Sequence, residues 1–228
     1  MASAQNFLQL AQHIIDNQID ELQLISFDVF DTLIYRKINP PEIVHERMAD
    51  EFFRLLNGRS KASSLLQLRY EAEHNLRSRT AKAGYDYECK YDELLELWVE
   101  KAIGKKDAEL VKRLHEAELI LELEALEKKP GIDKLLLPLS KREIPLIVIS
   151  DMYFGGKDIA RLLAAHKLDR YFDCIHVSAD EKVCKGTGRL FEVILNKYGC
   201  EPHQMLHIGD NVISDYQIPH SAGIHVIQ

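Results

Sequence analysis

The stretch "LQLISFDVFDTL", residues 22–33, joins the signal of a buried strand to an acidic turn. Its first half, 22–27, is an apolar run rich in Leu and Ile, as is typical of a strand inside a parallel sheet. Asp28 and Asp31 follow at once, with Phe30 between them. Ligands of open parallel sheets bind beyond the carboxyl ends of the strands. We therefore expect this stretch to provide one strand of a sheet and part of a site.

Further apolar runs predict the rest of the sheet, and they lie at 144–150, 174–178, 205–208 and 224–227. Apolar residues at helical spacing fill the gaps between the later runs, in "KDIARLLAAHKL", "RLFEVILNKYG" and "ISDYQIPHSAG". An alternation of strands and helices predicts an α/β fold. We expect a doubly wound, mostly parallel sheet with helices on both faces.

Residues 38–128 have a different character, because they are charged, lack strand-like runs and carry apolar residues at three- and four-residue steps. This pattern predicts an all-helical domain inserted between the first two strands of the sheet. "KKPGIDK" at 128–134 marks the return to the sheet. We predict an α/β core of residues 1–37 and 129–228 and a helical cap of residues 38–128. Helical spacing between residues 7 and 15 predicts one more amphipathic helix.

Composition limits the function classes. The chain has 228 residues and a formal net charge of −7, with no basic stripe, so we do not expect a nucleic-acid partner. No apolar run is long enough to span a membrane, and the first residues lack the pattern of a signal peptide. The four cysteines have no paired metal-ligand spacing and are interpreted as reduced thiols, so we expect a cytoplasmic protein.

The ends of the predicted strands supply a chemically coherent set of side chains. Ser150 and Asp151 follow the second strand, and Lys185 follows the third in "VCKGTGRLF". Asp210 and Asp215 follow the fourth in "GDNVISD". Such a set suits the attack of a carboxylate on phosphorus, because a divalent cation held by aspartates offsets the repulsion between anions. A hydroxyl and a lysine can then orient the phosphoryl oxygens.

Four motifs, "SFDVFDTL", "IVISD", "CKGTGRLF" and "HIGDNVISD", resemble in this order the motifs of the haloacid dehalogenase (HAD) superfamily. Each motif alone is weak, but four in order, each just after a predicted strand, are specific. The helical insertion resembles the mobile cap of many members. "FDVFDTL" together with "ISDMY" is also similar to a bacterial branch of HAD-like proteins that are encoded beside, or fused to, surface-polysaccharide glycosyltransferases. That similarity implies a glycosyltransferase domain or partner.

The resemblance implies a role for each matched residue. Asp28 matches the nucleophile that forms an aspartyl-phosphate. Asp28, the backbone carbonyl of Phe30, Asp210 and Asp215 match the acidic and metal-binding positions, which implies Mg²⁺ as the cofactor.

Other matched positions concern the phosphate. Ser150 matches the phosphate-binding hydroxyl, and Lys185 matches the lysine that steadies the nucleophile and the phosphate. Thr32 matches the residue that helps to hold the first loop beside the phosphate. Asp151 either faces the substrate or holds its own loop.

Phe30 departs from the pattern of the phosphatases. They carry there an aspartate that protonates the leaving group and activates water, and Phe cannot transfer a proton. An aromatic residue at this position is closer to the dehalogenase members. Asp31 stands one residue too late for the usual acid–base role, at a position where the family commonly has Gly. We favour a role for Asp31 in bracing the loop, with a catalytic role as the alternative.

The leading hypothesis is a magnesium-dependent phosphatase of a small phosphorylated metabolite such as a sugar or polyol phosphate. Phe30 then predicts slow turnover or a preference for good leaving groups. One alternative is a dehalogenase-like hydrolase, which needs no metal. Another is a catalytically weak binding or regulatory module that serves a glycosyltransferase. Family members usually continue past the position of Gln228, which leaves open that the chain is a piece of a longer protein.

Overall fold

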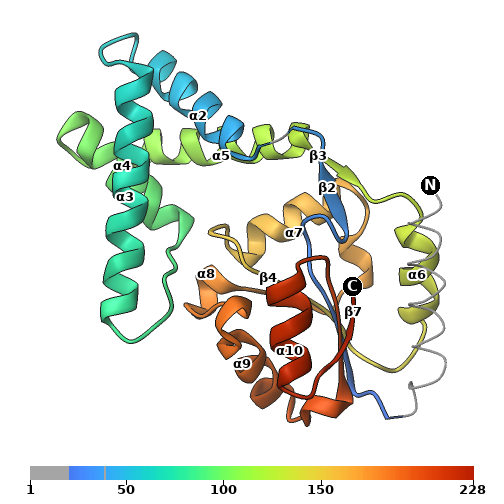
Figure 1. Ribbon diagram of the computed structural model, residues 1–228. Coiled ribbons are helices and arrows are strands. Elements are labelled where there is room, and N and C mark those ends of the chain that lie inside the picture. Colours follow the sequence, from blue (N-terminus) through green and yellow to red (C-terminus); the bar gives the residue numbers. More distant parts are fainter. Residues whose placement is uncertain (1–20, 39) are drawn as a thin grey trace.

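The computed structural model describes residues 21–38 and 40–228 (Figure 1). A five-stranded parallel sheet has the order β5-β4-β1-β6-β7. Its strands are β1 (Leu24–Phe27), β4 (Leu146–Ser150), β5 (Cys174–Val177), β6 (Met205–Ile208) and β7 (His225–Ile227). The five predicted strands and the doubly wound α/β architecture are confirmed. The helix predicted around residues 7–15 lies outside the described residues.

Strand β1 occupies the centre of the sheet. It pairs with β4 on one side and with β6 on the other, and all four of its residues are buried. The chain continues from β1 to β4 and β5 on one side, then crosses to β6 and β7 on the other. The winding thus changes direction at β1, and the crevice beyond the strand ends at such a switch point is where this fold binds ligands.

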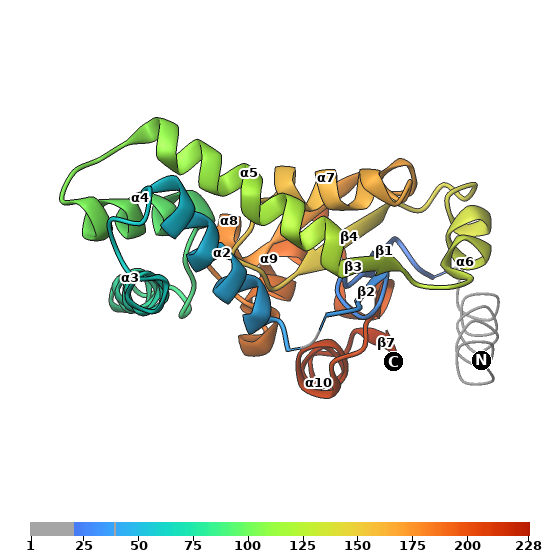
Figure 2. The same ribbon diagram turned by 90° about the horizontal axis from the view of Figure 1, so that it is seen from above.

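Alternate side chains of β1 enter two separate cores. Ile25 and Phe27 belong to the core that also contains buried residues of α6 (Ile132–Leu139) and α7 (Gly156–Ala165). Leu24 belongs to the core on the other face, which α9 (Arg189–Tyr198) completes. In Figure 2, α7 and α10 (Ile218–Ser221) lie on opposite sides of the sheet. The two-residue period of the strands thus places helices on both faces.

Four helices form a lobe beside the sheet, to the left in Figure 1: α2 (Glu42–Leu55), α3 (Ala62–Lys82), α4 (Tyr91–Ile103) and α5 (Ala108–Ala125). Trp98 is fully buried at its centre, where its Nε1–H donates to the carbonyl oxygen of Leu65 at 2.7 Å. Its ring meets that of Phe52 edge-on, with the ring centroids 4.8 Å apart. The apolar interior of the lobe is continuous with the core on one face of the sheet, because Phe52 and Trp98 belong to the same buried cluster as Phe27.

Two short strands at the base of this lobe were not predicted. Strands β2 (Ile34–Arg36) and β3 (Leu126–Lys128) pair antiparallel, so the segment 38–128 is not free of strand as expected. Each strand has only three residues, too few for a two-residue alternation to be recognised. The two strands also lie far apart in the chain, so no local sequence pattern could predict that they pair.

The segment 213–223 also differs from the regular helix predicted for it. It opens as a π-helix, η4 (Val212–Gln217), and only the four residues of α10 follow as α-helix. Pro219 has no N–H to donate to the preceding turn, which interrupts the ladder of a long α-helix. The Asn211 side chain caps the π-helix by accepting from the N–H groups of Ile213 and Ser214, both at 3.0 Å.

Buried polar contacts join the helical lobe to the core. The hydroxyl of Tyr153, which follows β4, donates to Glu118 Oε1 of α5 at 2.7 Å. Glu118 is itself fully buried and pairs with Arg69 of α3 at 2.8 Å. Arg161 of α7 also donates twice to Glu116 of α5, at 2.7 and 2.9 Å. The two parts therefore meet through directional polar bonds.

Among residues 21–38 and 40–228, no helix combines the length and the apolar character needed to cross a bilayer. The four cysteines all lie in this described part of the chain, and none of them forms a disulfide.

His115 of α5 bridges the helical lobe and the core, and it makes their contact depend on pH. Its Nδ1 lies 2.9 Å from Asp92 Oδ1 of α4, and its Nε2 lies 2.9 Å from Asp158 Oδ1 of α7. The hydrogen bond to Asp158 raises the pKa of His115 above its usual value, against the lowering effect of burial. The folded state thus binds this proton more tightly than the unfolded state. The resulting stabilisation is complete below the unfolded pKa of about 6.5 and is lost as the pH rises through the folded pKa.

We predict that His115→Gln removes this contribution. Between about pH 6 and about pH 8, the free energy of unfolding of the native protein should fall more than that of the variant. Urea titrations at each pH measure both quantities. His203→Gln, a change at an exposed histidine, is the control and should keep the native pH dependence. Identical pH dependence in the native protein and in His115→Gln would contradict the prediction.

Candidate active site

A single buried ammonium group joins two of the predicted site residues. Asp28 stands directly after β1, and its N–H donates to the carbonyl oxygen of Ile208 at the end of β6, at 2.9 Å. The short helix η2 (Lys185–Thr187) brings Lys185 to the same place. Lys185 Nζ lies 2.6 Å from Asp28 Oδ1 and 2.6 Å from Asp215 Oδ1. All three side chains are buried.

Burial and charge act on this cluster in opposite directions. Burial raises the pKa of Asp28 to about 6, against the lowering effect of Lys185. Burial also acts to raise the pKa of Asp215, but the hydrogen bond from His207 and the charge of Lys185 hold it well below its usual value. For Lys185, burial lowers the pKa, and the charges of Asp28 and Asp215 raise it overall. Lys185 is therefore kept as an ammonium and Asp215 as a carboxylate.

His207 supports Asp215 from within the sheet. Its Nε2 lies 3.2 Å from Asp215 Oδ1, and its Nδ1 lies 2.7 Å from the hydroxyl of Ser26. Burial lowers the pKa of His207, which favours the neutral ring. A neutral ring can donate from Nε2 to the carboxylate and accept the serine proton at Nδ1. The sequence predicted only that residue 207 lies in a strand. The role of His207 as a support for Asp215 depends on its pairing with Ser26 across β1 and β6.

Three carboxylates lie close enough to share a cation. One oxygen each of Asp28, Asp210 and Asp215 lies within 4.8 Å of the others. Asp210 is the exposed member, and the Thr32 hydroxyl donates to its Oδ1 at 3.4 Å. Burial and the charge of Asp215 raise the pKa of Asp210, as expected for a carboxylate near other anions. Carboxylate oxygens are the ligands that Mg²⁺ prefers, so this donor set fits the ion.

Asp31 braces the loop that follows β1. Its backbone has φ +60°, in the left-handed region where Gly is favoured and Asp is tolerated. Its N–H donates to the carbonyl oxygen of Ile34 at 2.6 Å, and its own carbonyl accepts from Lys129 Nζ at 2.7 Å. This geometry agrees with the bracing interpretation of Asp31, whose side chain is exposed.

Phe30 is used for packing at the base of the helical lobe. The guanidinium carbon of Arg36, on β2, lies 5.4 Å from the centre of the Phe30 ring. Arg36 donates two hydrogen bonds to the buried Glu122 of α5, at 2.7 and 3.1 Å. Phe30 stands where the phosphatases of the family carry the acid–base aspartate. It thus packs against Arg36, which joins this loop to α5 of the helical lobe.

The residues after β4 divide into two roles. Ser150 is 1% exposed, and its hydroxyl finds no hydrogen-bond partner within the described part of the chain. The Asp151 carboxylate accepts from the N–H of Lys185 at 2.9 and 3.1 Å and from the N–H of Gly186 at 3.3 Å. Of the two interpretations of Asp151, the geometry supports the one in which it holds a loop. Lys182, three residues before Lys185, instead places its amine 5.5 Å from the centre of the Tyr85 ring.

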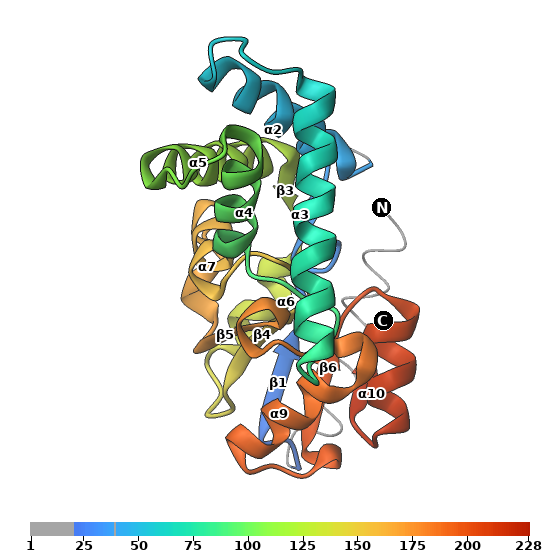
Figure 3. The same ribbon diagram turned by 90° about the vertical axis from the view of Figure 1, so that its left-hand side faces the viewer.

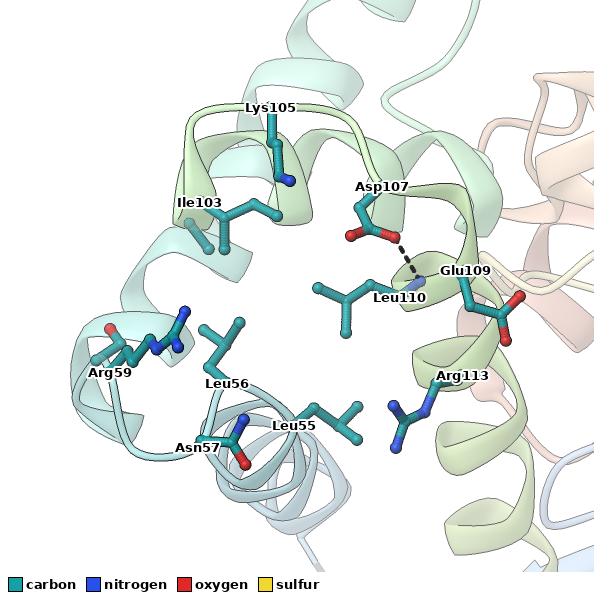
Figure 4. A pocket seen from close by; sticks show the side chains of 12 residues that line it. Leu55, Leu56, Asn57, Arg59, Ile103, Lys105, Asp107, Glu109, Leu110 and Arg113 are labelled. Carbon is teal, nitrogen blue, oxygen red and sulfur yellow. Dashed lines mark hydrogen bonds between the residues drawn. The ribbon is translucent and has the colours of Figure 1, made fainter.

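A cavity of about 640 Å³ lies far from these residues, between the ends of α2, α4 and α5 (Figure 4). Leu55, Leu56 and Leu110 point toward it, and Arg59 and Arg113 stand at its sides. It shares no residue with the carboxylate–lysine cluster and offers no nucleophile with an adjacent base. The candidate active site is therefore assigned from the cluster at the strand ends.

Gly209 leaves the space that Asp215 occupies. A Cβ at this position would lie 2.5 Å from both Cβ and Cγ of Asp215, closer than van der Waals contact allows. We predict that Gly209→Ala displaces Asp215 and lowers the free energy of unfolding by about 1–3 kcal/mol. Urea unfolding measures the loss. Gly186→Ala is the matched control, because no atom of the described residues lies within 4 Å of its added Cβ. Equal stability of the two variants would refute the steric argument.

Comparisons with known proteins show the family and the fold. The family model of the haloacid dehalogenase-like hydrolases matches residues 22–223. A 2-haloacid dehalogenase from Pseudomonas syringae pv. tomato DC3000 superimposes with a TM-score of 0.64 at 18% identity, over 90% of this chain and 85% of that one. An L-2-haloacid dehalogenase from Xanthobacter autotrophicus gives 0.52 at 16% identity, over 90% and 76%. A predicted phosphoglycolate phosphatase from Haemophilus somnus 129pt gives 0.50 at 17% identity, over 90% and 84%. No curated protein sequence gave a significant match.

Proposed function

The chain belongs to the haloacid dehalogenase-like hydrolases, and on this premise we propose that it is a magnesium-dependent phosphatase of a small phosphorylated metabolite. The observation that carries the proposal is the group formed by Asp28, Asp210 and Asp215, whose oxygens lie within 4.8 Å of one another. Lys185 already lies between Asp28 and Asp215, and a divalent cation would offset the further repulsion that Asp210 brings to the group. Carbon–halogen cleavage by an aspartate needs no such cation, whereas phosphoryl transfer gains from it.

The residues of the cluster suit nucleophilic attack at phosphorus. Asp28 attacks, the bond to the leaving-group oxygen breaks, and water then hydrolyses the aspartyl-phosphate to release phosphate and restore Asp28. Lys185 and the unpartnered Ser150 hydroxyl bind and orient the phosphoryl oxygens. Asp28, the carbonyl of Phe30 and Asp210 would hold Mg²⁺, with Asp215 as acidic support. When bound, the ion supplies neutralisation of phosphoryl charge.

Phe30 narrows the substrate class. Its side chain cannot donate a proton to the departing oxygen, so we expect slow turnover of sugar or polyol phosphates and faster turnover of substrates with better leaving groups. The helices of residues 38–128 act as a cap that covers the site and selects among sugar or polyol phosphates. A glycosyltransferase domain or partner would place such a substrate in surface-polysaccharide chemistry.

A dehalogenase-like activity is the second candidate, and Phe30 favours it. In that reaction Asp28 attacks a carbon atom, a halide leaves, and no proton donor is needed for the leaving group. The superimposed 2-haloacid dehalogenases share this fold at 16–18% identity. The acidic Asp210 argues for the phosphatase instead, because a carboxylate there suits a metal.

The two candidates differ in their product and in their need for metal. We expect phosphate release from an aryl phosphate or a sugar phosphate, lost with a chelator and restored by magnesium. Asp28→Asn should reduce the rate to background, because an amide is not a nucleophile. The test measures phosphate released by a panel of phosphorylated metabolites and halide released by 2-haloacids. Metal-independent halide release without phosphate release would overturn the phosphatase proposal. If the protein releases neither phosphate nor halide, the hypothesis of a binding module is favoured.

Ser150→Ala should lower the activity without lowering the free energy of unfolding. Its hydroxyl is buried and unpaired among the described residues, so its removal should leave the free energy of unfolding equal or higher. Loss of one hydrogen bond to the phosphoryl group should lower kcat/KM by about 10- to 100-fold. Ser26→Ala is the control, since that hydroxyl is bonded to His207 and its loss should lower stability by about 1 kcal/mol. Unfolding titrations and phosphate release measure both effects. A Ser150→Ala enzyme of native activity would contradict a phosphate-binding role.

A further inference from the structure

One carboxylate of the helical lobe reaches across to the turn that carries Lys185. Asp86 lies in the loop between α3 and α4, which approaches the start of α9 (Figure 3). Its Oδ2 accepts from the N–H of Cys184 at 2.7 Å and from the hydroxyl of Thr187 at 2.5 Å. Its Oδ1 accepts from Arg189 Nη1 at 2.9 Å. These three donors stand on both sides of Lys185.

The turn needs such external bonds because its backbone is irregular. Lys182 and Gly188, on either side of Lys185, have φ of +59° and +82°, and only three residues between them form a helical turn. From the core, Asp151 holds the N–H groups of Lys185 and Gly186. The Lys185 turn is therefore bonded by one carboxylate of the core and one of the helical lobe.

The loop that carries Asp86 is itself fixed on the core. The N–H of Asp86 donates to the carbonyl oxygen of Lys182 at 3.0 Å. Glu88, which is 3% exposed, accepts from the hydroxyl of Ser178 at 2.5 Å and pairs with Arg77 of α3 at 2.8 Å. Ser178 opens α8 (Ser178–Glu181), just before the turn. Asp86 therefore has a defined position only while this loop is docked.

We propose that Asp86 is a positioning residue that sets the Lys185 turn, so that docking of the helical lobe completes the catalytic cluster. The inference deepens the proposed function and rests on it for the role of Lys185. If the loop leaves the core, Cys184, Thr187 and Arg189 lose their shared acceptor. Nothing in the lobe then holds the turn that keeps the ammonium 2.6 Å from Asp28 and Asp215. A displacement of about 1 Å at a reacting centre lowers rates by about 100-fold.

The first test reads the position of Lys185 without any assay of turnover. Reductive methylation followed by peptide mass spectrometry measures the labelling rate of each lysine. In the native protein Lys185 should react slowly, because it is buried between two carboxylates. We expect Asp86→Asn and Asp86→Ala to label Lys185 at least about 10-fold faster, since an ammonium freed from its partners is exposed to the reagent. Lys128, at the end of β3 and paired with Asp133 of α6 at 2.6 Å, is the internal reference.

Glu116→Gln is the matched control, because it removes a bond between the helical lobe and Arg161 of the core without touching the turn. It should leave Lys185 protected. Equal protection of Lys185 in the native protein and in a folded Asp86→Asn variant would overturn the proposal. Faster labelling of Lys128 together with Lys185 would also overturn it, because a general loosening is not a positioning effect. If the Asp86 variants do not fold, Thr187→Val decides by the same comparison, since it removes one of the three bonds.

Kinetic measurements provide a second test of the role of Asp86. We expect Asp86→Asn to lower kcat for phosphate release by about 10- to 100-fold with little change in KM, because the turn acts on the reacting centre. Asp86→Glu, which keeps the carboxylate, should recover part of the loss. A change in KM alone would overturn the proposal. If the native protein releases no phosphate at all, the proposed function fails, while the labelling comparison still decides on the role of Asp86.

Discussion

The burial of one ammonium between two carboxylates constrains the whole α/β core. Removing Lys185, Asp28 and Asp215 from water is unfavourable by several kcal/mol per ion, and only close mutual contacts offset this. Contacts of 2.6 Å demand that the ends of β1 and β6 and the η2 turn are fixed relative to one another. The parallel pairing around β1 provides the first two, and the carboxylates of Asp151 and Asp86 hold the third.

The sequence allowed us to predict those features whose residues lie close together in the chain. Each strand is an unbroken apolar run, and Asp28, Lys185 and Asp215 all follow strand ends in the sequence, so the strands and the meeting of these three residues could be predicted from local patterns. The partnership of His207 with Asp215 depends on which strands are neighbours. The strands β2 and β3 are too short to show a period. Asp86 lies 99 positions before Lys185 in an unremarkable loop, and only the packed structure relates the two.

The connection between the helical lobe and the core combines a continuous apolar cluster with polar, directional contacts. Glu118 accepts from Tyr153 of the core and pairs with Arg69 of the lobe, and Glu88 accepts from Ser178 of the core, all at buried positions. Separating the lobe from the core removes the Tyr153 and Ser178 hydroxyls from these buried carboxylates before water can replace them. Intermediate separations are therefore unfavourable, and docked and undocked arrangements are expected to behave as two discrete states.

Phe30 has a consequence for how this sequence can change over evolutionary time. Its ring lies beneath Arg36, whose guanidinium is committed to the buried Glu122. Aspartate at position 30 would replace the ring contact with Arg36 by a second carboxylate beside the guanidinium that binds Glu122. The effect of a substitution at position 30 is therefore expected to depend on the residues at 36 and 122. Through Arg36 and Glu122, the residue type at the acid–base position is coupled epistatically to the connection with the helical lobe.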